Sequence, residues 1–192
     1  MRRQWYNPAM RISAKFSYED LQHFPPDHNR YEIVDGELFV TPAPIPLHQR
    51  IVMNLGAHLW NHVRAHHLGE VFVAPLDVVF TSGTVLEPDI IFVSRARLQI
   101  IGEKYLAGPP DLVVEVLSKS SSRLDRDIKP KQYARYGVPE FWLIDPEAKT
   151  VEIFRLQGEE YELAQRLEFG DTIASPLFPG LNLPVSSLWE CF

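Results

Sequence analysis

Residues 110–118 read PDLVVEVLS, and this stretch decides the fold because it is typical of a strand buried on both faces. Its leucines and valines form a nearly continuous apolar run that does not alternate with polar residues. Glu115 interrupts the run. An ionised carboxylate away from water needs a charged partner, hydrogen bonds or a metal ion. The sequence therefore predicts that another segment brings such a partner to Glu115.

The composition favours one compact globular domain. The chain has 192 residues, of which 45% are hydrophobic and 23% charged, enough for a sizeable core. It contains no run of roughly 20 apolar residues of the kind that crosses a bilayer. The single Cys191 excludes an internal disulfide and a Cys-based zinc site. We therefore expect a cytoplasmic protein that forms one domain over residues 1–192, with its core in residues 17–155.

The formal net charge of −6 counts against a large non-specific nucleic-acid-binding surface, which usually has an excess of basic residues. It does not exclude a nuclease. An enzyme that holds a divalent metal ion among carboxylates can be acidic overall, because the cation supplies positive charge where the phosphate binds. The net charge is therefore compatible with either class.

Three helices are predicted from spacing and capping residues. A capping-box pattern begins a short helix over residues 18–24, and residues 48–67 carry apolar side chains at helical spacing. A third helix follows the polar stretch after residue 118. With Asp127 as its N-cap, Pro130 falls in the first turn, where its missing N–H has no cost, and Gly137 ends the helix.

Residues 30–40, RYEIVDGELFV, predict a β-hairpin, because Asp35-Gly36 is a strong signal for a two-residue turn. Such a turn places Val34 opposite Glu37, and Ile33 opposite Leu38. Glu37 then lies with Glu32 on a face of mixed polarity. We expect this face to be able to reach a polar site.

Apolar runs separated by turn residues predict the remaining strands. These runs are VFVAPLDVVF (71–80), EPDIIFV (87–93), DLVVEVLS (111–118), EFWLID (140–145) and TVEIFR (150–155). The chain has no internal repeat or linker. The fold class is therefore α/β, with a mixed β-sheet core flanked by helices and an N-terminal β-hairpin.

Asp89 is the best candidate partner for Glu115 on a neighbouring strand. Residues two apart in a strand share a face, so Asp89 goes with Ile91, and Glu115 goes with Val113. If the two strands are adjacent, their carboxylates form a hard-oxygen site of the kind that holds Mg²⁺ together with water and a substrate phosphate.

This arrangement resembles the PD-(D/E)XK nuclease superfamily, which places an Asp after Pro on one strand and Glu-x-Lys on the next. Over most of residues 17–155 the chain resembles, more narrowly, the Uma-type family of restriction-endonuclease-like proteins. The motifs that carry the resemblance are YEIVDGEL (31–38), HQRI (48–51), EPDIIFV (87–93), PPDLVVEVLSKSS (109–121) and DRDIKPKQYARYGVPEFWLID (125–145).

The chain departs from the superfamily at one position, because Leu117 stands where the motif has its lysine. The resemblance implies that the following helix supplies the missing cation. Lys129 matches the family's lysine, with Lys131 and Lys119 as alternatives.

The resemblance implies metal-assisted hydrolysis of nucleic-acid phosphodiester bonds, with DNA as the first candidate substrate. Asp89, Glu115 and the Val116 carbonyl would ligate Mg²⁺, with Glu37 as an additional ligand and Mn²⁺ as a substitute ion. Lys129 would orient the attacking water or neutralise charge on the phosphoryl oxygens. A homodimer is expected by analogy with nucleases that cut two strands.

Other interpretations remain open. The fold can serve as a non-catalytic module that binds nucleic acid or protein, with Glu115 paired to a basic side chain. His58, His62 and His66 share one helix face, a spacing that can chelate zinc in a zinc-histidine hydrolase. His48 matches the family pattern and can approach the site. The serines between 118 and 122 can contact phosphate, although a solvated loop is their default role.

Overall fold

Strand β8 (Leu112–Val116) lies inside a six-stranded mixed sheet of the computed structural model, which describes residues 15–118 and 122–191. All five β8 residues are buried, as their apolar run predicts. The strand pairs in parallel with β9 (Glu140–Asp145) and antiparallel with β6 (Ile90–Ser94). The other strands of this sheet are β3 (Gly69–Val73), β10 (Thr150–Gln157) and β11 (Glu160–Leu167).

A second sheet of five strands begins with the predicted hairpin, β1 (Arg30–Val34) and β2 (Glu37–Thr41). The predicted register is confirmed, because Val34 pairs with Glu37. The turn residues Asp35 and Gly36 both have positive φ, 51° and 86°, as a type I′ turn requires. The other strands of this sheet are β4 (Val78–Thr81), β5 (Thr84–Leu86) and β7 (Leu106–Ala107).

The apolar run 71–80, predicted as one strand, is divided between the two sheets. Residues 71–73 belong to β3 in the six-stranded sheet, and residues 78–80 belong to β4 in the five-stranded sheet. Pro75 lies between them and has no N–H for a strand ladder, so the chain leaves one sheet here and enters the other.

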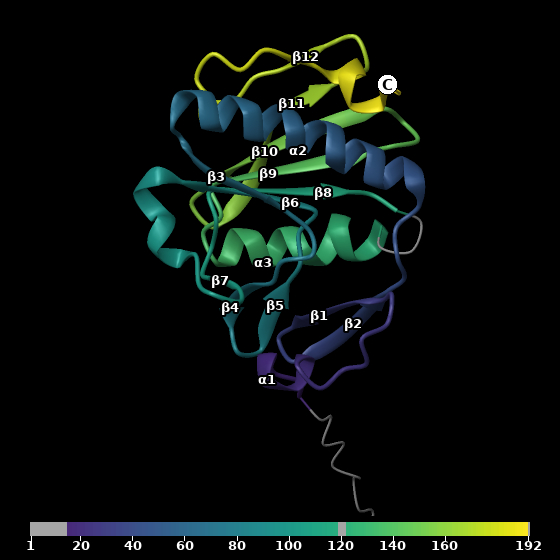
Figure 1. Ribbon diagram of the computed structural model, residues 1–192, viewed down its shortest axis with the longest axis vertical. Coiled ribbons are helices and arrows are strands. Elements are labelled where there is room, and N and C mark those ends of the chain that lie inside the picture. The colour runs from purple at the N-terminus through teal and green to yellow at the C-terminus, as the bar shows by residue number, and fades with distance from the viewer. Residues whose placement is uncertain (1–14, 119–121, 192) are drawn as a thin grey trace, which may run out of the picture.

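Helix α2 (Pro46–His66) covers one face of the six-stranded sheet (Figure 1). It begins two residues before the predicted range, because Pro46 fits the first turn of a helix. It ends at His66, and the next residue, His67, caps it in the left-handed conformation. Helix α1 (Tyr18–Leu21) is shorter than predicted. No helix among the described residues has the length and apolar character needed to span a membrane.

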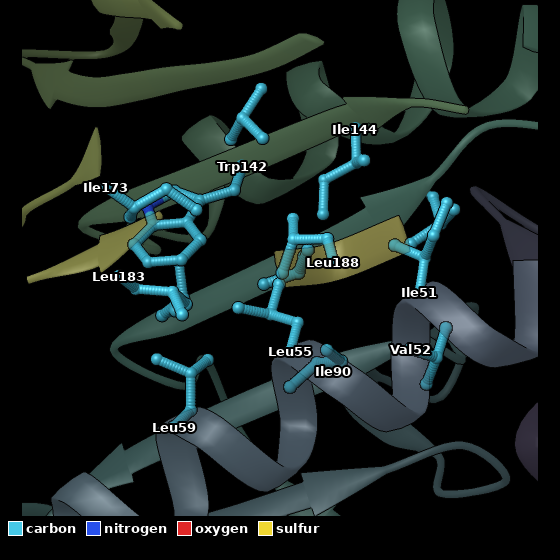
Figure 2. Close-up of a cluster of buried hydrophobic side chains, with 14 of the residues drawn as sticks. Ile51, Val52, Leu55, Leu59, Ile90, Trp142, Ile144, Ile173, Leu183 and Leu188 are labelled. Atoms are coloured by element: carbon cyan, nitrogen blue, oxygen red, sulfur yellow. The ribbon is translucent and has the colours of Figure 1, made fainter. Parts of the chain in front are cut away.

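The main core lies between α2 and the six-stranded sheet. Figure 2 shows Leu55 and Leu59 of α2 pointing toward Trp142 and Ile144 of β9. Residues beyond position 155 also contribute to this core. They belong to the small β12–β13 pair (Thr172–Ile173 and Leu183–Pro184), its connecting loop and the 3₁₀ helix Val185–Trp189, and are Ile173, Phe178, Leu183, Val185 and Leu188.

Helix α3 (Lys129–Arg135) packs on the other face of the six-stranded sheet, on the side of β1, β4 and β5 (Figure 1). A second apolar cluster joins it to both sheets. Val113 and Phe141 contribute from one sheet, Val34 and Leu86 from the other, and Tyr133 from the helix. Successive side chains of a strand point to opposite faces, and the two faces of β8 therefore pack against different helices.

The prediction that the third helix starts after an Asp127 cap is wrong. The backbone is already helical at residues 122–123, and Asp127 lies exposed inside a π-helical turn, Leu124–Ile128. The Lys129 N–H bonds to the carbonyl of Leu124, five residues back. This wider turn gives room to Pro130, whose ring would crowd the preceding carbonyls of a regular α-helix.

The other end of α3 follows the prediction. Gly137 has a φ of 79°, its N–H bonds to the Ala134 carbonyl, and the Val138 N–H bonds to the Tyr133 carbonyl. These are the two hydrogen bonds of a Schellman motif, which ends a helix at a residue of positive φ.

We predict that Leu55→Ala lowers the free energy of unfolding by about 2–5 kcal/mol, because Leu55 is fully buried between α2 and the sheet. Urea unfolding followed by circular dichroism measures this change. Met53→Ala, on the same helix but 68% exposed, is the control and should stay within about 0.5 kcal/mol of the wild type. Equal losses in the two variants would contradict the assigned buried face.

Candidate active site

The structure brings Asp89 and Glu115 together. Strands β6 and β8 are neighbours, with Ile90 paired to Val114. Continuing this antiparallel register by one residue sets Asp89 beside Glu115, on the same face of the sheet. The Val116 N–H donates a 2.7 Å hydrogen bond to Oδ2 of Asp89, which fixes this carboxylate against β8.

Glu115 is fully buried and has two polar partners from α3. Its Oε1 lies 3.1 Å from Nζ of Lys129 and accepts a hydrogen bond from the Tyr133 hydroxyl. Its Oε2 is also buried, and no group in residues 15–118 or 122–191 donates a hydrogen bond to it. Burial raises the pKa of Glu115 well above its ordinary value, and the Lys129 ammonium acts in the opposite direction.

Lys129 is the cation of a buried cluster of three carboxylates. Its Nζ lies 2.8 Å from Oε1 of Glu32 and 3.0 Å from Oδ1 of Asp125, in addition to its contact with Glu115. Burial alone would lower the pKa of Lys129. The surrounding carboxylates outweigh this effect and hold its pKa well above the ordinary value, so the ammonium stays charged.

Asp89 has its own set of partners. Oδ1 lies 2.9 Å from Nη2 of Arg30, and Oδ2 lies 3.1 Å from Nε2 of His48. Burial raises the pKa of Asp89, but His48, Arg30 and the Val116 N–H outweigh it and bring the pKa to about 2. Asp89 is therefore an anion at neutral pH. Arg30 also pairs through Nε with Oε1 of Glu87, at 2.9 Å.

A cavity of about 280 Å³ opens onto this group of charges. Arg30, Glu32, His48, Glu87 and Lys129 line it, together with the loop 41–44. The charged residues therefore form the wall of a space into which a small polar group can enter.

Other candidates from the sequence are placed as follows. Glu37 is exposed at the turn end of the hairpin, so the structure does not bring it to the cluster. Glu32 contributes the hairpin carboxylate instead, because it lies deeper in the hairpin, opposite Phe39. Lys131 is exposed, and Lys119 lies outside the described residues, as do two of the serines between 118 and 122.

Asp125 and Tyr133, like Arg30, Glu32 and Glu87, were not among the site residues predicted from the sequence. Asp125 and Tyr133 flank Lys129 at intervals of four, so all three side chains lie on one side of the helical segment. The spacing was visible, but the predicted start at Asp127 left Asp125 outside the helix.

His58, His62 and His66 of α2 do not form a metal site. His58 is exposed, His62 stacks on His66 with ring centroids 4.2 Å apart, and His62 Nε2 lies 3.2 Å from the Pro179 carbonyl. Over the described ranges, no three His, Cys, Asp or Glu side chains are placed to hold a metal ion. A zinc-histidine hydrolase therefore finds no support in this geometry.

The donor chemistry around Asp89 fits a divalent cation bound by few protein ligands. Within residues 15–118 and 122–191, two permanent cations, Arg30 and Lys129, contact five carboxylates: Glu32, Glu87, Asp89, Glu115 and Asp125. Oε2 of Glu115 has no partner among the described residues. Mg²⁺ usually takes one or two carboxylates and completes its shell with water and phosphate. Asp89, Glu115 and the Val116 carbonyl offer such a set.

We predict that Lys129→Met lowers the free energy of unfolding by about 3–5 kcal/mol, because it leaves three buried carboxylates without their cation. Urea unfolding at pH 7 measures the loss. Adding Glu32→Gln should restore part of it, and Lys131→Met, on the exposed side of the same helix, should change stability by at most about 0.5 kcal/mol. If the double variant lost as much stability as the sum of the two single variants, the pairing of Lys129 with Glu32 would be contradicted.

We predict that Glu87→Gln is stabilising at high pH in the presence of EDTA. Burial raises the pKa of Glu87 from 4.5 to about 7, despite Arg30. The raised pKa contributes stability that is complete below pH 4.5 and is lost as the pH rises through about 7. The neutral glutamine avoids this loss, so the variant should be more stable by about 1–3 kcal/mol at pH 8. Unfolding curves at pH 4.5 and pH 8 measure the difference in free energy of unfolding between the variant and the wild type. An equal difference at the two pH values would contradict this prediction.

Comparison with known proteins identifies the family and the fold of this chain. The family model Uma2, described as "Putative restriction endonuclease", matches residues 18–186. No curated protein matches the chain. A crystal structure from Anabaena variabilis, described as a putative nuclease belonging to DUF820, has a TM-score of 0.74 at 22% identity and covers 91% of this chain and 97% of its own. That likeness shows the shared fold. The family model matches most of the length of this chain, and this match shows that the chain belongs to the Uma2 family of restriction-endonuclease-like proteins.

Proposed function

We propose that this protein is a metal-dependent endonuclease that hydrolyses phosphodiester bonds of nucleic acid, with DNA as the first candidate. The observation that carries the proposal is the pair formed by Asp89, directly before β6, and Glu115 on the neighbouring strand β8, with Lys129 beside Glu115 at the wall of a cavity. Membership of a restriction-endonuclease-like family supports a nuclease. A carboxylate pair with a neighbouring ammonium group suits phosphodiester hydrolysis.

In this proposal Asp89, Glu115 and the Val116 carbonyl hold Mg²⁺, or Mn²⁺ in its place. When bound, the ion polarises the phosphate and lowers the pKa of a coordinated water. Oε2 of Glu115 is the ligand atom with no hydrogen-bond donor among the described residues, and Asp89 is already ionised at neutral pH. Glu32 replaces Glu37 as the hairpin carboxylate nearest the site.

Lys129 contributes a fixed positive charge. Its ammonium group is held by Glu32 and Asp125 as well as by Glu115, so its position does not depend on a single contact. A preorganised cation at this position stabilises the negative charge that develops on the phosphoryl oxygens, and it can orient the attacking water. Asp125 and Tyr133 act as positioning residues, Asp125 through Lys129 and Tyr133 through Glu115.

A homodimer would supply two such sites for the two strands of a duplex. This part of the proposal rests on analogy of fold. The alternative is a module that binds nucleic acid or protein without cleaving it, in which the cluster only holds the two sheets and α3 together. Catalysis by the isolated protein distinguishes the two.

We predict that the wild type cleaves supercoiled and single-stranded DNA with Mg²⁺ or Mn²⁺ and is inactive with EDTA. Glu115→Gln and Asp89→Asn keep the side-chain shapes and should each lower the rate by at least about 100-fold, because each removes a charged metal ligand. Glu162→Gln, exposed on β11, is the matched control and should cleave like the wild type.

Manganese binding, measured by titration calorimetry on the same proteins, separates the alternatives. Binding by the wild type that weakens in Glu115→Gln and Asp89→Asn supports the proposed ligands. Folded wild type that neither binds Mn²⁺ nor cleaves DNA or RNA would overturn the nuclease proposal and favour the binding module.

A further inference from the structure

Arg30 stands at the junction between the carboxylate cluster and the cavity. It begins β1 two residues before Glu32, so the two side chains share a face of the strand. Its side chain is 18% exposed and lines the cavity wall. Nη2 pairs with Asp89 and Nε pairs with Glu87, each at 2.9 Å. One edge of the guanidinium therefore lies against the site while the residue still reaches the open space.

A metal ion and Arg30 compete for the same carboxylate. Oδ2 of Asp89 already contacts His48 and accepts the Val116 N–H, which leaves Oδ1, the oxygen paired with Arg30, as the more available ligand atom. A dication bound there would lie close to the guanidinium, and the two positive charges would repel each other. Binding of the ion therefore weakens the contact between Arg30 and Asp89.

We propose that Arg30 is the counter-ion of Asp89 in the metal-free protein and becomes a ligand of the substrate phosphate when a divalent cation binds Asp89. This inference rests on the proposed function. Glu87 keeps its hold on Nε, so the guanidinium stays at the cavity wall while Nη2 turns from the carboxylate to a phosphate oxygen. The planar guanidinium suits this role because its donors match the spacing of phosphate oxygens.

The exchange keeps the charges balanced. Without metal, the guanidinium offsets the anion of Asp89. With metal and substrate, the dication takes over that role, and the released positive charge meets the negative phosphodiester. Arg30 thereby couples metal binding to substrate binding, because the phosphate replaces Asp89 as the anion that pairs with the guanidinium.

The test compares wild type with Arg30→Gln in the full-length protein. We expect Arg30→Gln to bind Mn²⁺ at least about threefold more tightly in calorimetry, because the competing cation is gone. With Mn²⁺ saturating, its kcat/KM for a single-stranded oligonucleotide should fall at least about tenfold, because the phosphate loses a charged donor. The matched control is Arg155→Gln, which removes another partly exposed arginine from a buried carboxylate, Glu140, and should change neither value.

A second variant covers a failure of Arg30→Gln to fold. Arg30→Lys keeps the charge, but its single ammonium cannot hold Asp89 and Glu87 in the two-pronged geometry of the guanidinium. It should shift both measurements in the same directions by smaller factors. Circular dichroism establishes that each variant is folded before it is compared.

The outcomes separate this inference from the proposed function. If the wild type binds Mn²⁺ and cleaves, but the folded Arg30 variants bind Mn²⁺ no more tightly, only the Arg30 inference is overturned. Tighter Mn²⁺ binding without loss of kcat/KM would also overturn it, since the arginine would then be a counter-ion alone. If the wild type neither binds Mn²⁺ nor cleaves, the proposed function falls, and the inference falls with it.

Discussion

The structure depends on the burial of one carboxylate, that of Glu115, in its most apolar strand. A charge in that position is unfavourable unless opposite charge and hydrogen bonds compensate it. Lys129 and Tyr133 supply both from one helix face, and this requirement fixes how α3 docks on the sheet. The apolar contacts of the second cluster hold the same helix in place, so packing and electrostatics specify one arrangement.

The same requirement joins the two sheets. Glu32 comes from β1 in the five-stranded sheet, Glu115 from β8 in the six-stranded sheet, and Lys129 from the helix that packs against both. Arg30 and Asp89 form a second bridge between the same two sheets. The charges that line the cavity therefore also hold its walls together. Replacing any one of them affects stability as well as chemistry, and only isosteric variants with stability controls separate the two effects.

Much of this arrangement was accessible from sequence because its signals are local. The apolar run around Glu115 predicted a buried strand, the Asp35-Gly36 turn fixed the hairpin register, and residue spacing set the shared faces of Asp89 and Glu115. Lys129 was found through family resemblance. What was missed depends on tertiary contacts or unusual backbone. Glu32 and Glu37 share the polarity pattern of the hairpin, and only the depth at which each residue sits in the fold distinguishes them.

Asp125 was missed for a different reason. The π-helical turn before Pro130 lengthens the helix toward its N-terminus, and ordinary capping rules predict a start at Asp127 instead. A proline in the first α-helical turn is a common signal for a helix start, so the rule failed where the backbone departs from the α-helix. Such turns are frequent at functional sites, and here the turn places Asp125 and Lys129 side by side.

Carrying the cation on α3 has a consequence for how the protein matures. A helix of this length has no stability of its own in water, so the ammonium group reaches its position only after docking. Docking in turn needs β9, which pairs with β8 and comes later in the chain than every residue of the cluster. A nascent chain on the ribosome therefore holds the cavity residues unassembled until most of the sheet has emerged. The walls of the cavity therefore come together only in a chain that has been synthesised past residue 145.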